Sequence, residues 1–255
     1  MGKGKQNKFF DMKMSANNSN SADIFIYGEI TKYAWEEYGE HSATTFKNEL
    51  DALGDDLETI NLYVNSPGGS VFEGVTIHNM LKRHKARVIA HVDALAASIA
   101  SVIIMAADEI RMPSNSMLMI HNPWTFAIGN SAELRKQADD LDRIGNSSKQ
   151  SYLQKAGDKI TDEKLQELLD AETWLSAEEA YSYGLCDVVE DANQMAASVS
   201  DDLFAKYKNV PKHLKLVVNN SQIEDSGEEI AMRKKIAEEA KVNASYLNTI
   251  LGGII

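Results

Sequence analysis

The chain has 255 residues, of which 44% are hydrophobic and 25% are charged, so it can bury one sizeable core and still carry appendages. Its formal net charge of -12 argues against a nucleic-acid-binding body, because neutralising phosphates requires clustered Lys and Arg. Its single cysteine, Cys186, excludes an internal disulfide and a metal site with several cysteines, and it fits a cytoplasmic setting.

Residues 1–21 are rich in Gly, Asn, Ser and Lys, and they contain no apolar run long enough for a signal peptide. We therefore predict a disordered N-terminal leader. The longest apolar run, residues 94–107, covers about 14 residues, whereas a membrane-crossing helix needs roughly 20. We interpret this run as a core helix and expect no membrane partner.

Strand and helix patterns alternate along the next part of the chain. Apolar side chains recur with a period of two over residues 23–30, which is typical of a strand with one buried face. Helical spacing follows at residues 46–53 and again at 71–81, with strand-like runs at 59–64 and 87–92. This alternation predicts an α/β domain with a largely parallel sheet and right-handed crossovers.

Further elements are predicted in the second half of the chain. Short strand-like pieces occur at residues 109–112 and 116–120, and a long, mostly polar helix is predicted at 131–156. Its narrow apolar stripe cannot bury the helix in its own core, so the helix either packs as an arm against a neighbour or flanks the core in solvent. Ser176 and Glu179 form a capping box that predicts the start of another helix.

The composition changes near the C-terminus. Residues 214–218 are strand-like, and a charged helix is predicted at about 228–241, after a link rich in Asn, Ser, Asp and Gly. The chain therefore divides into a leader, a main domain and a partly disordered C-terminal extension, at residues 1–21, 22–191 and 192–255.

Ser98 stands where a strand-like run ends and an apolar helix begins. The first amides of a helix lack intrahelical partners and are electropositive, so they can stabilise negative charge that develops near this hydroxyl. The alternative is that residues 93–101 are only a close-packed helix start. As a nucleophile, Ser98 needs a base, a group that orients the base, and donors for an oxyanion.

Two of the six histidines lie in or at the end of a predicted strand. His91 is in the middle of the strand that leads to Ser98, whereas His121 follows a strand and precedes Asn122 and Pro123. Active sites of open α/β sheets assemble at the strand ends, so we predict that His121 is the base.

The turn at residues 65–70 has the sequence Asn-Ser-Pro-Gly-Gly-Ser and lies between a strand and a helix. Its glycines let backbone amides approach a ligand with no Cβ in the way. It can be an ordinary turn, or one amide wall of an oxyanion pocket whose other wall is the Ile99 amide. A phosphate cradle is disfavoured, because the lysine of a P-loop is missing.

Four segments, in this order, resemble the successive signatures of the ClpP-type serine peptidases. They are Asn-Ser-Pro-Gly-Gly at 65–69, Ala-Ala-Ser-Ile-Ala at 96–100, Met-Ile-His-Asn-Pro at 119–123, and Trp-Leu-Ser-Ala-Glu-Glu-Ala at 174–180 with Gly-Leu at 184–185. The resemblance covers about residues 24–189. Segments 26–30, 121–124 and 172–175 further resemble the ClpP-like head maturation (prohead) proteases of tailed phages.

The resemblance implies a ClpP/crotonase-like spiral of βαβ units in which residues 131–156 form a protruding handle helix. It implies that Ser98 is the nucleophile and His121 the general base. Gly69 and Ile99 match the two backbone donors of the oxyanion hole.

The third member of the implied triad departs from the family pattern. The family has an aspartate two residues before the aromatic of its last motif, and Glu172 occupies that position here. Glutamate can orient a histidine as aspartate does, although its extra methylene moves the carboxylate by about a bond length. Asp170 is the alternative.

The resemblance also implies the function and the partners. It implies a serine endopeptidase that forms an acyl-enzyme without ATP, metal or cofactor, in heptameric rings that stack in pairs through the handle helices. For a phage protein the substrates are capsid or scaffold proteins, in the host cytoplasm or the prohead. Because the chain has no P-loop, any ATPase is a separate protein.

Four other functions compete with this one. A housekeeping Clp proteolytic subunit fed by a separate ATPase shares the same motifs, and a non-catalytic capsid-assembly module shares the fold. A crotonase-type acyl-CoA enzyme is disfavoured by the motifs around Ser98 and His121. A signal-peptide-peptidase-like enzyme with a Ser-Lys dyad is disfavoured by His121 and by the lack of a membrane anchor.

Overall fold

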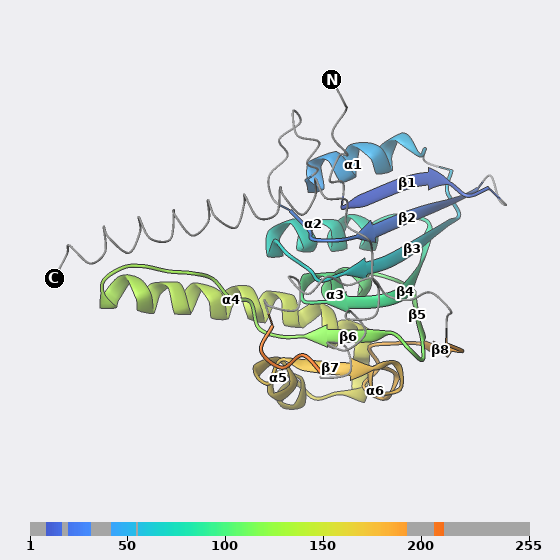
Figure 1. Ribbon diagram of the computed structural model, residues 1–255. Coiled ribbons are helices and arrows are strands. Elements are labelled where there is room, and N and C mark those ends of the chain that lie inside the picture. The colour runs from blue at the N-terminus through green and yellow to red at the C-terminus, as the bar shows by residue number, and fades with distance from the viewer. Residues whose placement is uncertain (1–8, 17–19, 32–41, 55, 193–206, 212–255) are drawn as a thin grey trace, which may run out of the picture. The chain divides into compact units, whose positions relative to one another are not determined.

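The structure is a computed structural model that describes residues 9–16, 20–31, 42–54, 56–192 and 207–211 (Figure 1). Two compact units divide the chain between Pro211 and Lys212, later than the boundary expected near residue 191. The second unit lies outside the described residues, as do the strand predicted at 214–218 and the helix predicted at 228–241.

The described residues form eight strands and seven helical segments. The strands are β1 (Phe10–Met14), β2 (Ser21–Tyr27), β3 (Thr59–Ser66), β4 (Arg87–Ala97), β5 (Glu109–Pro113), β6 (Met117–Ile120), β7 (Thr173–Ser176) and β8 (Val188–Glu190). The helices are α1 (Ala43–Ala52), α2 (Val71–Lys82), α3 (Ile99–Ile104), α4 (Ser131–Ala156), the short 3-10 helix η2 (Gly157–Lys159), α5 (Asp162–Asp170) and α6 (Ala177–Ser182).

One sheet contains all of these strands, in the order β1-β2-β3-β4-β5-β8, while β6 pairs with β4 and β7 pairs with β6 (Figure 1). The pairs from β2 through β5 to β8 are parallel, as is β4 with β6, whereas β1 and β7 pair antiparallel. The α/β fold with a mostly parallel sheet is therefore confirmed.

The strand register separates a buried face of the sheet from a partly exposed one. Ile24 pairs with Leu62, which in turn pairs with Ala90, and all three are fully buried. The neighbouring register on the other face places Tyr63 between Phe25 and His91, with its ring stacked on both at centroid distances of 4.8 and 4.9 Å. His91 therefore belongs to an aromatic row on the sheet.

Strand β4 is longer than predicted. Residues 94–97 were expected to begin a core helix, but they are strand, and α3 begins only at Ile99. The physical reason is tertiary pairing: Leu95–Ala97 lie beside Met117–Met119 of β6, and these ladder hydrogen bonds override the weak strand propensity of alanine. The extension carries the chain to the sheet edge where Ser98 lies.

The N-terminal leader is not wholly disordered, which corrects the prediction for residues 1–21. Residues 10–14 form β1, which pairs antiparallel with β2. Phe9 and Phe10 are buried, and the Phe10 ring meets the Phe46 ring edge-on at 5.1 Å. Two adjacent aromatic residues in a polar segment provide enough apolar area to attach it to the core.

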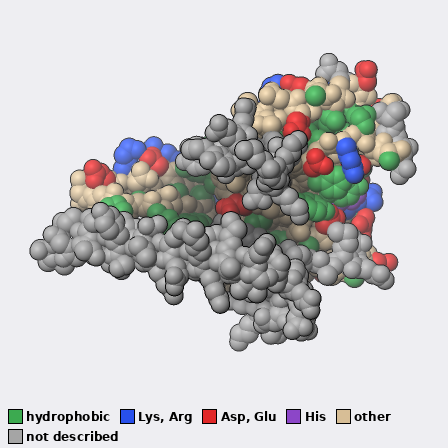
Figure 2. All heavy atoms as spheres, turned by 45° about the horizontal axis from the view of Figure 1, so that its top comes forward, with side chains coloured by type: hydrophobic (Ala, Val, Ile, Leu, Met, Phe, Trp, Pro, Cys, Tyr) green, Lys and Arg blue, Asp and Glu red, His purple; other side chains and the backbone are tan. Residues whose placement is uncertain are grey.

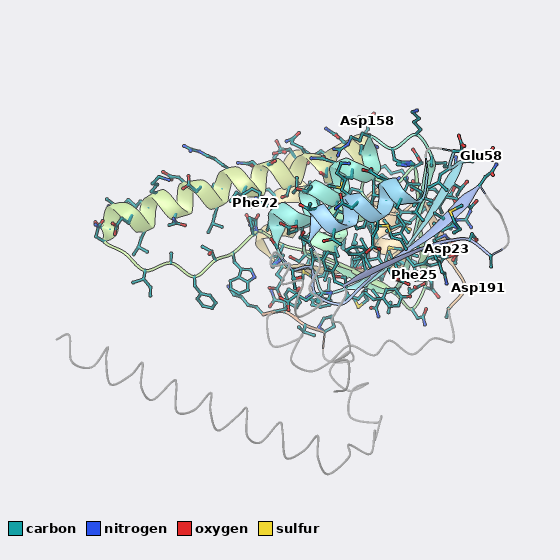
Figure 3. The ribbon with its side chains drawn as sticks, turned by 90° about the horizontal axis from the view of Figure 1, so that it is seen from above. Asp23, Phe25, Glu58, Phe72, Asp158 and Asp191 are labelled. Atoms are coloured by element: carbon teal, nitrogen blue, oxygen red, sulfur yellow. The ribbon has the colours of Figure 1, made fainter. Side chains whose placement is uncertain are left out.

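Helix α4 extends away from the sheet, and the segment between β6 and α4 runs beside it (Figures 1 and 3). Asn130 caps its first turn in a capping box with Glu133. Its buried side chains, Lys149, Tyr152 and Ala156, all lie in its C-terminal part. On the visible face of the projecting part, acidic, basic and hydrophobic side chains are all exposed (Figure 2). The predicted bounds of 131–156 are confirmed.

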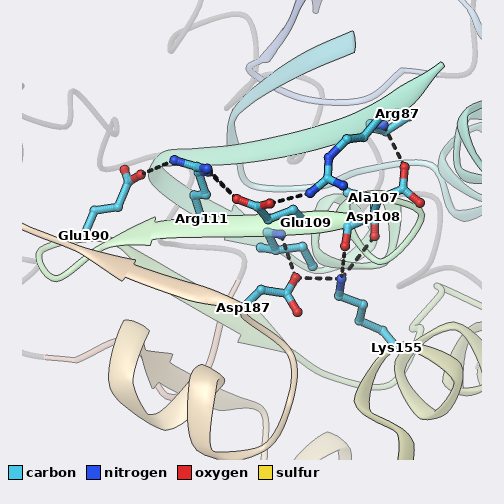
Figure 4. A network of polar contacts seen from close by, with 10 residues as sticks. Arg87, Ala107, Asp108, Glu109, Arg111, Lys155, Asp187 and Glu190 are labelled. Atoms are coloured by element: carbon cyan, nitrogen blue, oxygen red, sulfur yellow. Dashed lines mark hydrogen bonds and ion pairs between the residues drawn. The ribbon is translucent and has the colours of Figure 1, made fainter. Parts of the chain in front are cut away.

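A polar network connects the C-terminal end of α4 to β5 and to the residues at and before β8 (Figure 4). Lys155 of α4 forms an ion pair of 2.7 Å with Asp187, whose carboxylate also accepts a hydrogen bond from the Ile110 amide. On β5, Arg111 lies between Glu109 and Glu190. The contacts of Lys155 attach the buried end of α4 to the core.

Candidate active site

Ser98 has an unusual backbone conformation, with φ 54° and ψ -128°. A non-glycine residue at positive φ costs about 1–3 kcal/mol and persists only where its surroundings enforce it. Here the Ser98 amide donates to the Met119 carbonyl at 2.9 Å, and the Ser98 carbonyl accepts hydrogen bonds from the amide and hydroxyl of Ser101. The end of β4 and the start of α3 thus hold the residue in a strained turn.

The structure brings His121 to Ser98, as the sequence predicts. Because β6 is parallel to β4, both strands end at the same edge of the sheet, and His121 comes directly after β6. Its Nε2 lies 2.8 Å from the Ser98 Oγ, which is a hydrogen bond. This pair can transfer a proton directly.

Burial lowers the pKa of His121 below its ordinary value of about 6.5. The negative charge of Glu172 partly opposes this shift, while the positive charge of Lys208 adds to it. The imidazole is therefore neutral near pH 7 and able to accept the hydroxyl proton.

Of the two candidate acids, the structure brings Glu172 to His121. The Oε2 atom of Glu172 lies 4.0 Å from the Nδ1 atom of His121, a charge contact beyond hydrogen-bond distance. Glu172 also has a positive φ, 49°, in the turn between α5 and β7. Asp170 instead accepts hydrogen bonds from the side chains of Asn122 and Gln166, at 2.7 and 2.8 Å.

The glycine turn lies directly against Ser98. A Cβ on Gly68, at φ 91°, would be 2.7 Å from the Ser98 Cβ, and one on Gly69 would be 2.1 Å from the Ile30 carbonyl oxygen. The Ile30 amide donates a hydrogen bond to the Gly68 carbonyl, and the Ile30 carbonyl accepts one from the Ser70 amide. Since successive residues of an extended chain alternate their hydrogen-bonding sides, the Gly69 amide points away from Ile30. Both positions therefore require glycine.

Two cavities meet at Ser98 and His121. The smaller, about 30 Å³, is lined by side chains of α3, α4 and α5, among them Val102, Lys149 and Tyr152. The larger, about 210 Å³, lies along the glycine turn and reaches Trp124 and Tyr207. The larger cavity leaves room for a peptide segment beside the Ser98 hydroxyl, whereas the smaller one has room only for a small group.

Sequence reasoning missed residues 207–211, which it assigned to the C-terminal extension. Tyr207 meets the rings of His121 and Trp174 edge-on, each at 5.7 Å, and its hydroxyl donates to the Pro67 carbonyl. Asn209 donates its backbone amide to Glu172 at 2.7 Å. An aromatic residue shortly before a Val-Pro pair is the available sequence signal, and it is too common to identify a site.

The described residues were also searched for metal and membrane features. Within them, no three or more His, Cys, Asp or Glu side chains gather where they could hold a metal ion. None of the helices in that part of the chain is both long and apolar enough to span a bilayer. Cys186 is buried, and burial raises the pKa of its thiol to about 11, which suits a packing role.

A serine hydroxyl bonded to a neutral imidazole, at the ends of parallel strands and beside a glycine turn, is the arrangement of a serine-type hydrolase. Comparison with known proteins makes this specific: the profile of the Clp protease family matches residues 11–193. The chain belongs to the Clp protease family, and it is a peptidase. The expected kinship with ClpP-type peptidases is thereby confirmed.

Three relatives illustrate the extent of the similarity, and each is named an ATP-dependent Clp protease proteolytic subunit. Subunit 3 of Rhizobium meliloti is 31% identical over 173 residues, covering 67% of this chain and 84% of that protein. Subunit 3 of Rhodococcus jostii is 32% identical over 142 residues, covering 55% and 69%. The subunit of Pleurastrum terricola is 31% identical over 138 residues, covering 53% and 69%.

Proposed function

We propose that this protein is a serine endopeptidase in which Ser98, His121 and Glu172 act as nucleophile, general base and orienting acid. The observation that carries the proposal is the 2.8 Å hydrogen bond between the Ser98 Oγ and the His121 Nε2, at a residue held in a strained backbone conformation. The chemistry requires no metal, cofactor or ATP.

The reaction proceeds in two halves. The Ser98 Oγ attacks the peptide carbonyl while its proton passes to His121 Nε2. The negative oxygen of the intermediate accepts hydrogen bonds from the backbone amides of Gly69 and Ile99. Protonated His121 then gives that proton to the leaving amine, which leaves an acyl-enzyme. Water loses a proton to His121, attacks the ester and releases the acid, after which Ser98 regains its proton.

Glu172 stabilises the transient imidazolium. Its Oε2 faces the Nδ1 atom of His121 at 4.0 Å, and a carboxylate there favours the protonated ring electrostatically. Apo geometry is often loose at catalytic hydrogen bonds and tightens when substrate binds. Glu172 is therefore the proposed acid in preference to Asp170.

Replacing Ser98 with Ala tests the proposal. In a matched control, Ser182→Ala changes a hydroxyl on α6 that bonds to the Glu179 carbonyl. We expect a fluorophosphonate probe to label the parent and the control and to leave the Ser98→Ala variant unlabelled, with peptide hydrolysis lost in parallel. Continued labelling or hydrolysis by the Ser98→Ala variant contradicts the assignment.

We further propose that a second copy of the chain packs along α4, as in stacked heptameric rings. The support is apolar exposure where the polypeptide projects: Trp124 is 53%, Phe126 90% and Ile128 103% exposed. Exposed apolar side chains next to a helix with a narrow apolar stripe are typical of a homo-oligomeric interface. In sedimentation, Phe126→Asp should reduce the assembled mass, whereas Tyr181→Ser on α6 should leave it unchanged.

For the substrate we propose capsid or scaffold protein, on the strength of the phage-type segments at 26–30, 121–124 and 172–175. That places the enzyme in a host cytoplasm or prohead. The relatives' names favour a second assignment, a proteolytic subunit fed by a separate ATPase. Cleavage of a folded phage scaffold protein without any ATPase supports the first, and cleavage of unfolded chains alone supports the second.

A further inference from the structure

Residues 207–211 lie against the active site although they fall outside the family match, which ends at residue 193. Val210 is buried, at 6% exposed, and the half-buried Tyr207 packs between the rings of His121 and Trp174. The segment therefore contributes contacts to the site from outside the residues that the family profile matches.

Asn209 binds the turn that carries the proposed acid. Its backbone amide donates to Oε1 of Glu172 at 2.7 Å, and its side-chain amide donates to the Ala171 carbonyl at 2.7 Å. Glu172 has a positive φ and a flexible side chain, so it needs outside contacts to stay in place. With Oε1 held by Asn209, Oε2 is the oxygen that faces His121.

Tyr207 connects His121 to the glycine turn on the opposite side of the site. Its hydroxyl donates to the carbonyl of Pro67, at the start of the glycine turn, while its ring lies edge-on to His121. It also lines the larger cavity together with Gly68 and Gly69. One side chain thus contacts both the base and the turn that supplies the proposed oxyanion donor.

We propose that Tyr207 and Asn209 are positioning residues of the peptidase: Asn209 holds the Glu172 carboxylate toward His121, and Tyr207 fixes the imidazole ring relative to the glycine turn. This inference rests on the proposed function, because it requires Glu172 to act on His121. It assigns to the C-terminal segment a part of the catalytic geometry.

The test uses the full chain and a double-mutant cycle. Asn209→Pro removes the backbone N–H that donates to Glu172, whereas Asn209→Ala keeps that N–H and loses only the side-chain bond to Ala171. We expect Asn209→Pro to lower kcat on an unstructured peptide about tenfold to 100-fold with little change in KM, since displacing a catalytic group by 1 Å has effects of this size. Asn209→Ala should lower kcat less than Asn209→Pro does, because it removes only the side-chain bond to the Ala171 carbonyl.

Coupling separates positioning from a merely structural role. If Asn209 acts through Glu172, then Asn209→Pro should have little further effect on kcat in a Glu172→Gln background. Losses that multiply independently, or an unchanged kcat in Asn209→Pro, overturn the proposal. Circular dichroism and the thermal midpoint identify a variant that fails to fold.

Variants of Tyr207 provide a second, less disruptive test in case proline at position 209 disrupts the segment. Tyr207→Phe removes only the bond to Pro67, and Tyr207→Ala also removes the ring, so kcat should fall in that order. A rise in activity for Tyr207→Ala overturns the proposal, because it shows that the ring blocks the cleft. If the Ser98→Ala variant is still labelled, the proposed function fails; if only the Asn209 and Tyr207 variants behave normally, only the positioning role fails.

Discussion

The two sides of His121 are built differently. On one side Ser98 is held by neighbours in the sheet and in the first turn of α3, and it lies within hydrogen-bond distance of the ring. On the other side Glu172 is 4.0 Å away, and its carboxylate accepts a hydrogen bond from Asn209, which follows it by 37 positions. Adjacent parallel strands fix the nucleophile side, whereas the acid side depends on a distant segment.

Gly68→Ala should have the largest effect among the changes that probe this comparison. The new Cβ would lie 2.7 Å from the Ser98 Cβ and from the Ala97 carbonyl oxygen, so the nucleophile must shift. We expect kcat/KM to fall about 100-fold or more. Gly54→Ala is the control, because it also has a positive φ but has open space around it. Equal losses in the two variants contradict a close fit at Ser98.

Glu172→Gln should have a smaller effect. Neutralising a triad aspartate that is bonded directly to its histidine lowers kcat about 10⁴-fold. Because Glu172 is 4.0 Å from His121, we expect a loss nearer 10- to 100-fold. The matched Asp170→Asn variant should be close to the parent, since Asp170 contacts Asn122 and Gln166 instead. A larger loss in Asp170→Asn shows that the acid is misassigned.

The pH profile should move in opposite directions for the two charges near His121. Activity requires the neutral ring, so kcat/KM falls as the pH drops through the pKa of His121, which is below 6.5. Glu172 raises this pKa and Lys208 lowers it. The acid limb should therefore shift to lower pH in Glu172→Gln and to higher pH in Lys208→Ala. Shifts of the same sign would falsify this electrostatic account.

Asp187→Ala should change catalysis least and stability most. Asp187 pairs with Lys155 and accepts a hydrogen bond from the amide of the fully buried Ile110, and it lines neither cavity at Ser98. Leaving that amide without its acceptor costs about 1–3 kcal/mol in the free energy of unfolding. Chemical denaturation should show the loss, while kcat at low temperature stays near that of the parent.

Sequence reasoning reached the nucleophile side and stopped short on the acid side. Ser98, His121 and the glycine turn could be predicted as candidates, because strand ends and helix starts are visible as local residue patterns. Glu172 is favoured over Asp170 in the sequence only through the family resemblance, since their difference depends on the α5–β7 turn and on hydrogen bonds to Asn122 and Asn209. Contacts between segments that are distant in the chain produce no periodic residue pattern in the sequence of either segment.

The same limit explains two of the differences from the predicted fold. Residues 94–97 are strand because β6 pairs with them, and residues 10–14 are ordered because two buried phenylalanines attach them to the core. Both outcomes depend on partners elsewhere in the chain rather than on local propensity. The bounds of α4, by contrast, follow from its own caps and polar pattern.

The positive φ values of Ser98 and Glu172 have a consequence for heat inactivation. Relaxing either residue to an ordinary backbone conformation would lower its free energy, so each stays in place only while its surrounding contacts remain formed. Small-scale opening generally needs less free energy than melting of the whole sheet. On warming, hydrolysis should therefore fade while the circular dichroism signal is still native, so that catalytic lifetime depends on the weakest support.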